Sequence, residues 1–383
     1  MKKISTVFLL IFMILSLFAC NKPNADGEAD LQTDNQTSDS STTIGYWEDD
    51  VDHFARDAYD VYYIHNSSMN LERLLFECFQ NLESYLNVKV TDLTANSDID
   101  LYLGLYSAAV SAGADGVICD MHYEYQARIM ELLDEASIPY IGMFNHVYND
   151  WEQQQQIAPT VAMNQHLNGA KQIEILLETY PEYWGDIDSS EIACLILTTS
   201  SNDDFITRQQ GAEEMFQELY PRNPLFISDA MIFGNADTAR GYELLRIFIE
   251  DHPDTKYLLV ASVSQDYALS AEMAAVDFGR TDTILIASSG DMLFSEWDKG
   301  YDGNWVSTYV TYHYEYAIPA MCGLIAMMDG RVDKYTLWQE LRIGDDLCTR
   351  YLADGRMVTR GNYKDMEQAV LDKYGIVEHI IAN

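Results

Sequence analysis

Basic side chains are scarce in this sequence. It contains 23 lysines and arginines against 61 aspartates and glutamates, which gives a formal net charge of −38 over 383 residues. A chain with this charge repels nucleic acid, so we expect no nucleic-acid partner. The carboxylates are spread along the whole chain, which indicates the solubility of an exposed protein more than a binding site.

The sequence also lacks the common motifs of enzyme chemistry. It has no Gly-x-Ser-x-Gly, no glycine-rich phosphate loop ending in Lys-Ser or Lys-Thr, and no His-Glu-x-x-His. No nucleophile with an adjacent base and no carboxylate pair at a defined separation is visible. We therefore expect no enzyme activity and no cofactor.

Cysteine is infrequent, and no two of the six cysteines have the spacing of zinc ligands. Cys119 and Cys194 lie in apolar, strand-like runs, whereas Cys78 and Cys322 lie on apolar positions of helix-like stretches. We predict that these are buried free thiols.

A long apolar run occurs at the N-terminus. Met1-Lys2-Lys3 precedes an unbroken apolar run over residues 7–15, and Ala19 and Cys20 follow. This order is typical of an export signal with a lipobox, because the apolar run is short for a transmembrane helix and a small residue precedes the cysteine. We predict a signal peptide over residues 1–19 and lipidation at Cys20, which would anchor the protein on the extracytoplasmic face of a membrane. The alternative is an ordinary secretory signal in which Cys20 has no role.

Residues 20–43 are mostly Asn, Asp, Gln, Ser and Thr. Such a segment cannot bury enough apolar surface to fold, so we expect a flexible tether. The folded body then spans residues 44–383, a length that suggests two lobes.

Within the body, short apolar runs alternate with amphipathic helical stretches. The runs are apolar throughout, as in strands that are covered on both faces. Helical spacing is clear over residues 71–82 and 167–177, and a closing helix is expected over 364–374. This alternation predicts an α/β fold with two doubly wound parallel-sheet lobes joined by a hinge. The predicted strands are 61–64, 116–119, 140–144, 192–197, 225–227, 257–261, 283–287 and 305–310.

The order of these elements suggests where the lobes divide. The polar stretch 149–156 separates two groups of strands, so we expect the first crossover near it. The first lobe would contain residues of about 55–146 and 313–335. The second lobe would contain about 150–310 and part of the C-terminal segment, and residues 331–383 receive no further assignment.

Polar and aromatic residues follow nearly every predicted strand, where parallel sheets bind ligands. Each alone is more often a helix cap or a turn residue, but their recurrence favours a site. Carboxylates, amides, a guanidinium and aromatic rings suit a hydroxyl-rich ligand. The candidate ligand-binding residues are Asn66, Asp120, Tyr123, Asn145, His146, Asp203, Arg208, Gln265, Asp266, Asp291 and Tyr312.

Several histidines offer an alternative, since they follow strands and could meet in one cleft to bind a metal ion. Histidines beside tyrosines are more often hydrogen-bonding residues of a cleft, so we predict no metal site. The four histidines concerned are His65, His122, His146 and His313.

Four stretches of the body resemble the type I periplasmic binding proteins, especially the sugar-binding branch with the ribose- and galactose-binding proteins. The likeness extends from about Val61 to Gly330. By this resemblance Arg208 and Asp266 are the best candidates for ligand contacts. The stretches are 112–119 with 138–141, 161–164 with Gly169, 208–211 with Phe216, and 260–269.

Two positions depart from the family pattern. Asn145-His146 stands where sugar binders commonly have Asp-Arg or Asp-Ser, and residues 288–291 read Ser-Ser-Gly-Asp in place of a late Phe-Asp-Gly. The resemblance implies an extracytoplasmic lipoprotein that closes around a small polar ligand, a sugar in the first instance, and delivers it to an ABC importer. A membrane sensor kinase or chemoreceptor is the alternative partner. We do not expect a transcription regulator of the same fold, because the predicted anchor and not a helix-turn-helix segment precedes the body.

Overall fold

The computed structural model describes residues 51–66, 70–122, 124–148, 155–234, 237, 239–353 and 355–374. All of them belong to one compact unit, Thr43–Asn383. The predicted signal peptide, the tether, Cys20 and the candidate ligand residue Tyr123 lie outside the described residues. No helix among the described residues combines the length and the hydropathy that a bilayer crossing requires.

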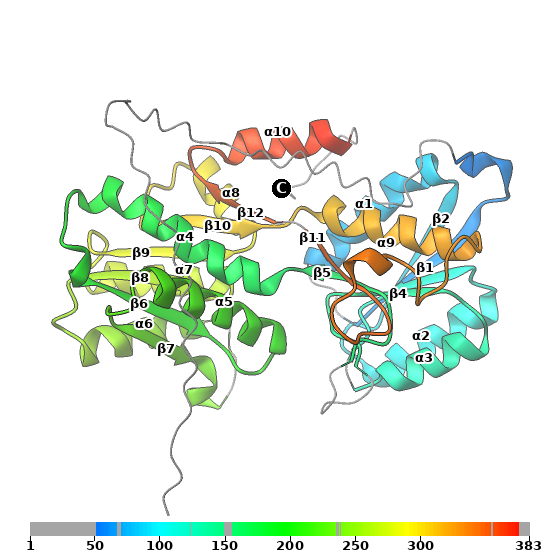
Figure 1. Ribbon diagram of the computed structural model, residues 1–383, viewed down its shortest axis with the longest axis horizontal. Coiled ribbons are helices and arrows are strands. Elements are labelled where there is room, and N and C mark those ends of the chain that lie inside the picture. Colours follow the sequence, from blue (N-terminus) through cyan, green and yellow to red (C-terminus); the bar gives the residue numbers. More distant parts are fainter. Residues whose placement is uncertain are drawn as a thin grey trace, which may run out of the picture. The chain divides into compact units, whose positions relative to one another are not determined.

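The first sheet has the strand order β11-β5-β4-β3-β1-β2, and its neighbours all pair in parallel. Helices α1 (Asn70–Leu86) and α9 (His313–Met328) contribute to the core on one face, and α2 (Ile99–Ala112) and α3 (Gln126–Glu135) cover the other (Figure 1). This sheet and its helices form the first lobe. The strands are β1 (Tyr59–His65), β2 (Val88–Thr94), β3 (Gly116–Cys119), β4 (Tyr140–Met143), β5 (Thr160–Met163) and β11 (Arg350–Ala353).

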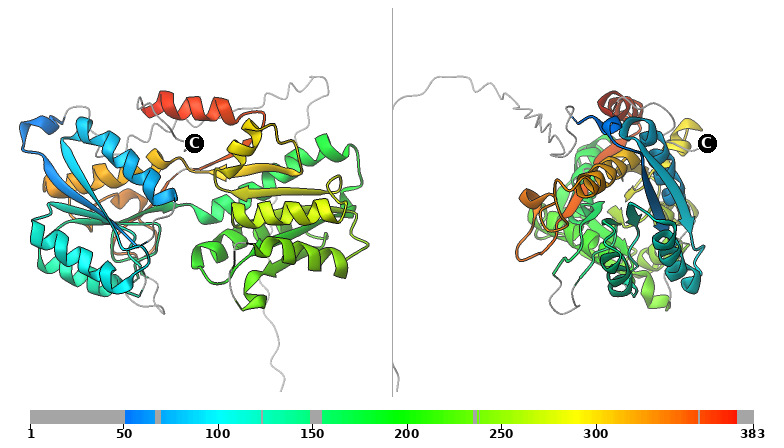
Figure 2. Two further views of the ribbon diagram at one scale, coloured as in Figure 1. Left: turned by 180° about the vertical axis from the view of Figure 1, so that it is seen from behind. Right: turned by 90° about the vertical axis from the view of Figure 1, so that its right-hand side faces the viewer.

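The second sheet has the order β12-β10-β9-β8-β6-β7 and is parallel except for β12, which pairs antiparallel with β10. Helices α4 (Gln165–Trp184) and α5 (Asp203–Leu219) lie on one face. The other face packs against α6 (Arg240–Asp251), α7 (Gln265–Asp277) and α8 (Met292–Asp298) (Figure 2, left). The strands of this second lobe are β6 (Ile192–Thr198), β7 (Leu225–Asp229), β8 (Tyr257–Ser262), β9 (Ile284–Ser289), β10 (Trp305–Val310) and β12 (Arg356–Thr359).

Shorter elements complete the described chain. The closing helix α10 (Tyr363–Tyr374) follows β12, in agreement with the predicted helix over 364–374. The 3₁₀ turns are η1 (His53–Ala55), η2 (Ser189–Glu191), η3 (Ala230–Phe233) and η4 (Gln339–Leu341).

Burial explains why the strands are apolar throughout. Every residue of β3, β6, β9 and β10 is buried, because helices cover both faces of each sheet. Edge strand β2 has an exposed Lys89 and several half-buried residues, which is why apolar runs alone did not predict it. The predicted buried free thiols are confirmed for Cys78, Cys119, Cys194 and Cys322, and Cys348 is a further buried free thiol among the described residues.

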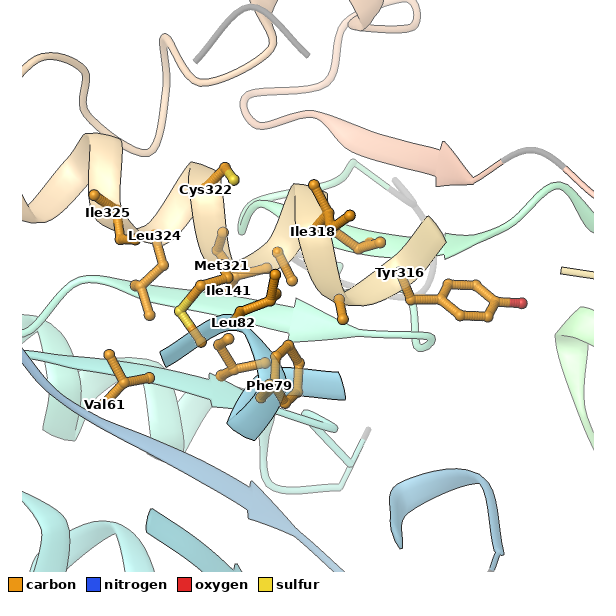
Figure 3. Packing of buried hydrophobic residues seen from close by; sticks show 14 of the residues in the cluster. Val61, Phe79, Leu82, Ile141, Tyr316, Ile318, Met321, Cys322, Leu324 and Ile325 are labelled. Atoms are coloured by element: carbon orange, nitrogen blue, oxygen red, sulfur yellow. The ribbon is translucent and has the colours of Figure 1, made fainter. Parts of the chain in front are cut away.

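Helix α9 is the central element of the first core. Its residues from Tyr314 to Met327 are all buried, as expected for a helix that is apolar on every side. Met321 and Leu324 point from α9 toward Ile141 of β4 and Leu82 of α1 (Figure 3). Tyr316, near the start of α9, belongs to the same cluster, and its ring extends away from the other labelled residues (Figure 3).

The chain passes between the two sheets three times. It leaves the first sheet after β5, returns between β10 and α9, and leaves again between β11 and β12. The prediction that the first crossover lies near residues 149–156 is therefore wrong, because β5 follows this stretch and still belongs to the first sheet. The first lobe also extends to Ala353 and not to about 335, since β11 pairs with β5. Neither β5 nor β11 was among the strands predicted from apolar runs.

The second and third crossings lie against each other. A Cβ on Gly355 would lie 2.2 Å from the Tyr309 ring and 2.6 Å from the Thr311 hydroxyl. Glu315, only 5% exposed, accepts a hydrogen bond from the Tyr312 backbone at 3.0 Å and pairs with Arg356. The pair between Glu315 and Arg356 therefore connects the start of α9 to β12 of the other lobe.

Two glycines bring α4 and α5 into backbone contact. A Cβ on Gly169 would lie 1.8 Å from the carbonyl oxygen of Arg208, and one on Gly211 would lie 1.9 Å from that of His166. No side chain fits at either position unless the helices move apart. This contact places the start of α5, and with it Arg208, against the first crossing.

Gly211→Ala is expected to lower the free energy of unfolding by about 1 to 3 kcal/mol, the usual cost of overpacking. Urea unfolding of the wild type and the variant measures this difference. Gly104→Ala at an exposed position of α2 is the matched control, because no neighbouring atom lies within 4 Å of its new Cβ. It should be neutral or stabilising by up to about 1 kcal/mol through helix propensity. Equal stability of Gly211→Ala and wild type would contradict the close helix contact.

Candidate ligand-binding cleft

Residues that follow strands of both sheets line two cavities. Cavity 1, about 220 Å³, has contributions from Leu71, Met163 and Tyr316 of the first lobe and from the ends of β9 and β10 of the second. Cavity 2, about 190 Å³, lies between the segment after β4 and the start of α5. Because each cavity has walls from both lobes, these cavities form the candidate cleft.

Aromatic side chains dominate cavity 1. Phe294, Tyr309, Tyr312 and Tyr316 line it, and Asp291 brings a carboxylate to the same walls. Rings provide flat apolar faces, and a carboxylate accepts hydrogen bonds from hydroxyl groups. Cavity 1 can therefore bind a ring that has an apolar face and a polar edge.

The loop after β9 is held in place by Gln265. Its Oε1 accepts a hydrogen bond from the Met292 backbone at 2.8 Å. Gly290 has φ 127°, and a Cβ there would lie 2.2 Å from the same Gln265 oxygen, so the position requires glycine. Gln265 thus lines cavity 1 while it fixes the loop that carries Asp291.

His313 also lines cavity 1. Burial lowers the pKa of its ring, and the negative charge of Asp291 opposes this effect. A neutral imidazole can both donate and accept a hydrogen bond, so His313 suits a hydroxylated ligand.

Cavity 2 is more polar. Asn145, His146 and Tyr148 come from the segment after β4, and residues 201–204 come from the start of α5. The His146 and Tyr148 rings stack at 4.8 Å between centroids. Asn202 caps α5 by accepting a hydrogen bond from the Asp204 backbone at 2.8 Å. Asp203 is exposed at this helix start and can bind hydroxyl groups from the cavity side.

Arg208 lies between the two cavities but lines neither. It is 6% exposed, and burial lowers its pKa to about 10. Its Nε donates to Gln165 Oε1 at 3.0 Å, and its Nη2 lies 3.8 Å from the sulfur of Met163. Gln165 in turn donates to Asp204 at 3.3 Å. A wall of one arginine and one glutamine therefore connects Met163 of cavity 1 to Asp204 of cavity 2.

Asn66 and Asp120 line neither cavity. Asp120 accepts hydrogen bonds from the Asn66 backbone at 2.7 Å and from the Tyr102 hydroxyl, and burial raises its pKa. Asn145 donates to the Asp120 carbonyl at 2.5 Å. These contacts tie the ends of β1, β3 and β4 together, so the structure gives the two residues a supporting position.

Asp266 is placed in the first turn of α7, half-buried and away from both cavity walls. The sequence-predicted residues that the structure brings to the cavities are Gln265, Asp291 and Tyr312 in cavity 1 and Asn145, His146 and Asp203 in cavity 2.

The sequence did not indicate Arg350. This residue begins β11, and its side chain is 10% exposed. It donates to the Phe144 carbonyl at 2.6 Å and to Asp204 of the other lobe at 3.2 Å, and it also contacts His146. Only the pairing of β11 with β5 brings it there. Tyr316 was also missed, although its spacing of four residues from Tyr312 on a helix was visible.

The four histidines do not meet. His65 contacts Asp92 at 2.7 Å, His122 packs against Tyr125, and His146 and His313 line different cavities. In the part of the chain that the structure describes, no three His, Cys, Asp or Glu side chains are grouped to hold a metal ion.

No protein-family model matches this chain, and no curated protein matches it. Solved structures do. A sugar-binding protein of a sugar ABC transporter from Bacillus halodurans has a TM-score of 0.64 at 16% identity, over 79% of this chain and 98% of that chain. A periplasmic solute binding protein from Actinobacillus succinogenes 130z, with bound D-allose, has a TM-score of 0.63 at 14% identity, over 81% and 100%. The arabinose-binding component from Shewanella sp. ANA-3 has a TM-score of 0.61 at 15% identity, over 85% and 99%.

At these identities the likeness defines the fold. The chain has the two-lobe α/β fold of the type I periplasmic binding proteins, which confirms the predicted fold class and the resemblance.

His146 gives the cleft a testable pH dependence. Burial, and then the charge of Arg350, lowers its pKa to about 4. The unfolded chain takes up this proton near pH 6.5, so the stability is fully present above that pH and is lost as the pH falls toward 4. His146→Asn should reduce the slope of stability against pH in this window by up to about 1.4 kcal/mol per unit. Urea unfolding between pH 4.5 and 7.5 measures the slope, and identical slopes would contradict the buried neutral ring.

Proposed function

We propose that this protein is an extracytoplasmic solute-binding lipoprotein that captures a sugar or polyol between its lobes and delivers it to an ABC importer. The observation that carries the proposal is the pair of cavities with walls from both lobes. A ligand in such a cleft contacts both lobes at once, so binding favours the closed arrangement of the hinge.

The chemistry of the cavity walls supports a hydroxylated ligand. Tyrosine and phenylalanine rings can cover the apolar face of a pyranose or an inositol, while Asp291 and Asp203 can accept bonds from hydroxyl groups. Relatives of this fold have been solved with D-allose, L-arabinofuranose and myo-inositol bound. These ligands share hydroxyl groups around a ring.

Membrane attachment rests on the sequence. Cys20 after the apolar run supports a lipid anchor, and the polar residues 20–43 support a tether that lets the body reach a permease. Closure of the lobes around a ligand could equally be recognised by a membrane sensor kinase or a chemoreceptor. Genes for a permease and an ATPase beside this one would indicate transport, and a histidine kinase gene would indicate sensing.

A thermal-shift screen tests ligand capture. We expect one class among D-allose, L-arabinose, D-galactose, D-ribose and myo-inositol to raise the melting temperature by several degrees. A ligand at one hundred times its Kd adds about 2.7 kcal/mol to the stability of the folded state. Nucleosides and amino acids serve as comparison ligands. A shift with these and with none of the sugars or polyols would contradict the proposed ligand class.

Asp291→Asn tests which carboxylate meets the ligand. The change keeps the shape of the side chain and removes its charge, so the affinity for the ligand found in the screen should fall about 10- to 100-fold. Asp266→Asn is the matched control, because Asp266 lines neither cavity, and its affinity should equal that of the wild type. Titration calorimetry measures both. The reverse pattern would place the ligand at the start of α7.

A further inference from the structure

The two ring nitrogens of His146 have different surroundings in cavity 2. Its Nε2 faces the guanidinium of Arg350, and its ring stacks on Tyr148. Its other nitrogen, Nδ1, makes no hydrogen bond to any residue that the structure describes. Because His146 lines cavity 2, Nδ1 is the nitrogen left for a ligand.

A guanidinium can donate hydrogen bonds but cannot accept them. The imidazole nitrogen that faces Arg350 must therefore carry a lone pair, and the single proton of the neutral ring must be on Nδ1. Burial and the positive charge of Arg350 hold the pKa of His146 at about 4, so the ring is neutral near pH 7.

The other charged groups around the ring do not reverse this assignment. Asp204, on α5, raises the pKa of His146, but its oxygens already accept from Arg350 at 3.2 Å and from Gln165 at 3.3 Å. Asp203 lies at the rim of the cavity on the same helix, and Tyr148 presents the face of its ring. The Nη2 of Arg350 donates both to the Phe144 carbonyl in its own lobe and to Asp204 in the other, and its Nη1 is the nitrogen that faces His146.

We propose that Arg350 is a positioning residue of the cleft, which holds His146 as the Nδ1–H tautomer so that this histidine donates a hydrogen bond to the ligand in cavity 2. The proposal rests on the proposed function and deepens it. A ligand group in cavity 2 must accept from His146 and can donate to the carboxylates of Asp203 and Asp204. A hydroxyl group does both, whereas a carboxylate or phosphate on the ligand would meet two negative charges.

The tautomer can be measured without any ligand. Long-range ¹H–¹⁵N spectra of the protein labelled at histidine distinguish a protonated Nδ1 from a protonated Nε2, and His146→Asn identifies the signals of His146. In the wild type at pH 7 we expect the proton on Nδ1. A proton on Nε2 would overturn the proposal.

Two substitutions of Arg350 separate its role from a merely structural one. Lysine also has donors only, so Arg350→Lys should keep the Nδ1–H form. Arg350→Met retains much of the apolar stem but has no donor, so the ring should take up the other tautomer in part and titrate at a higher pH. Asp204→Asn is the control, since it removes the negative charge of the pair across the lobes but leaves Arg350 beside His146, and it should leave the tautomer unchanged. An unchanged tautomer and titration in Arg350→Met would contradict the role of Arg350.

Affinity measurements on variants of His146 test the contact between this residue and the ligand. The amide nitrogen of asparagine can take the place of Nδ1–H, whereas that of glutamine lies nearer the position of Nε2. With D-allose, L-arabinose and myo-inositol as probes, His146→Asn should keep most of the affinity, and His146→Gln should lose about 2- to 10-fold, as for one neutral hydrogen bond. Greater loss in His146→Asn would overturn the donor role. If none of the probes bound the wild type, the proposed ligand class would fail, and the spectra would still decide the role of Arg350.

Discussion

Parallel pairing of the strands is the constraint on which the rest of this structure depends. Every described strand of the first sheet runs parallel to its neighbours, and β12 alone departs from this rule in the second. Parallel strands need helices as connections, and these helices cover both faces and make the strands apolar throughout. The same direction brings the carboxyl ends of neighbouring strands to one edge, so the polar residues after them converge. Parallel pairing therefore accounts for the buried cores, for the helical connections and for the position of the cleft.

The three crossings between the sheets turn these two edges into a cleft. Each crossing is held by contacts that leave little room, through Gly169 and Gly211 at the first and through Gly355 with the Glu315 to Arg356 pair at the others. A hinge needs segments that can rotate while their surroundings remain packed. The crossings combine short chain segments with firmly packed α4, α5 and α9, which suits rigid lobes that move about a small number of residues.

Charge is distributed unevenly between the surface and the cleft. The chain has a net charge of −38, yet Arg208 is buried and Arg350 is largely buried where the lobes meet. Burial of a guanidinium is tolerated when its donors are satisfied, and carbonyl oxygens, Gln165 and Asp204 satisfy most of them here. These arginines organise neighbouring groups: Arg208 orients Gln165 between the cavities, and Arg350 orients His146.

The sequence by itself determined the features that depend on local order: the alternation of apolar runs and helical stretches, the buried cysteines, and polar residues after the strands. Gln265, Asp291, Tyr312, Asn145, His146 and Asp203 reach the cavities because strand ends converge in any parallel sheet. Tertiary structure alone decided the rest. Strand β11 exists because it pairs with β5, far away in the chain, and this pairing brings Arg350 to His146. Asn66, Asp120 and Asp266 occupy equivalent strand ends and yet line neither cavity, because side-chain direction and neighbouring contacts depend on packing that no local pattern records.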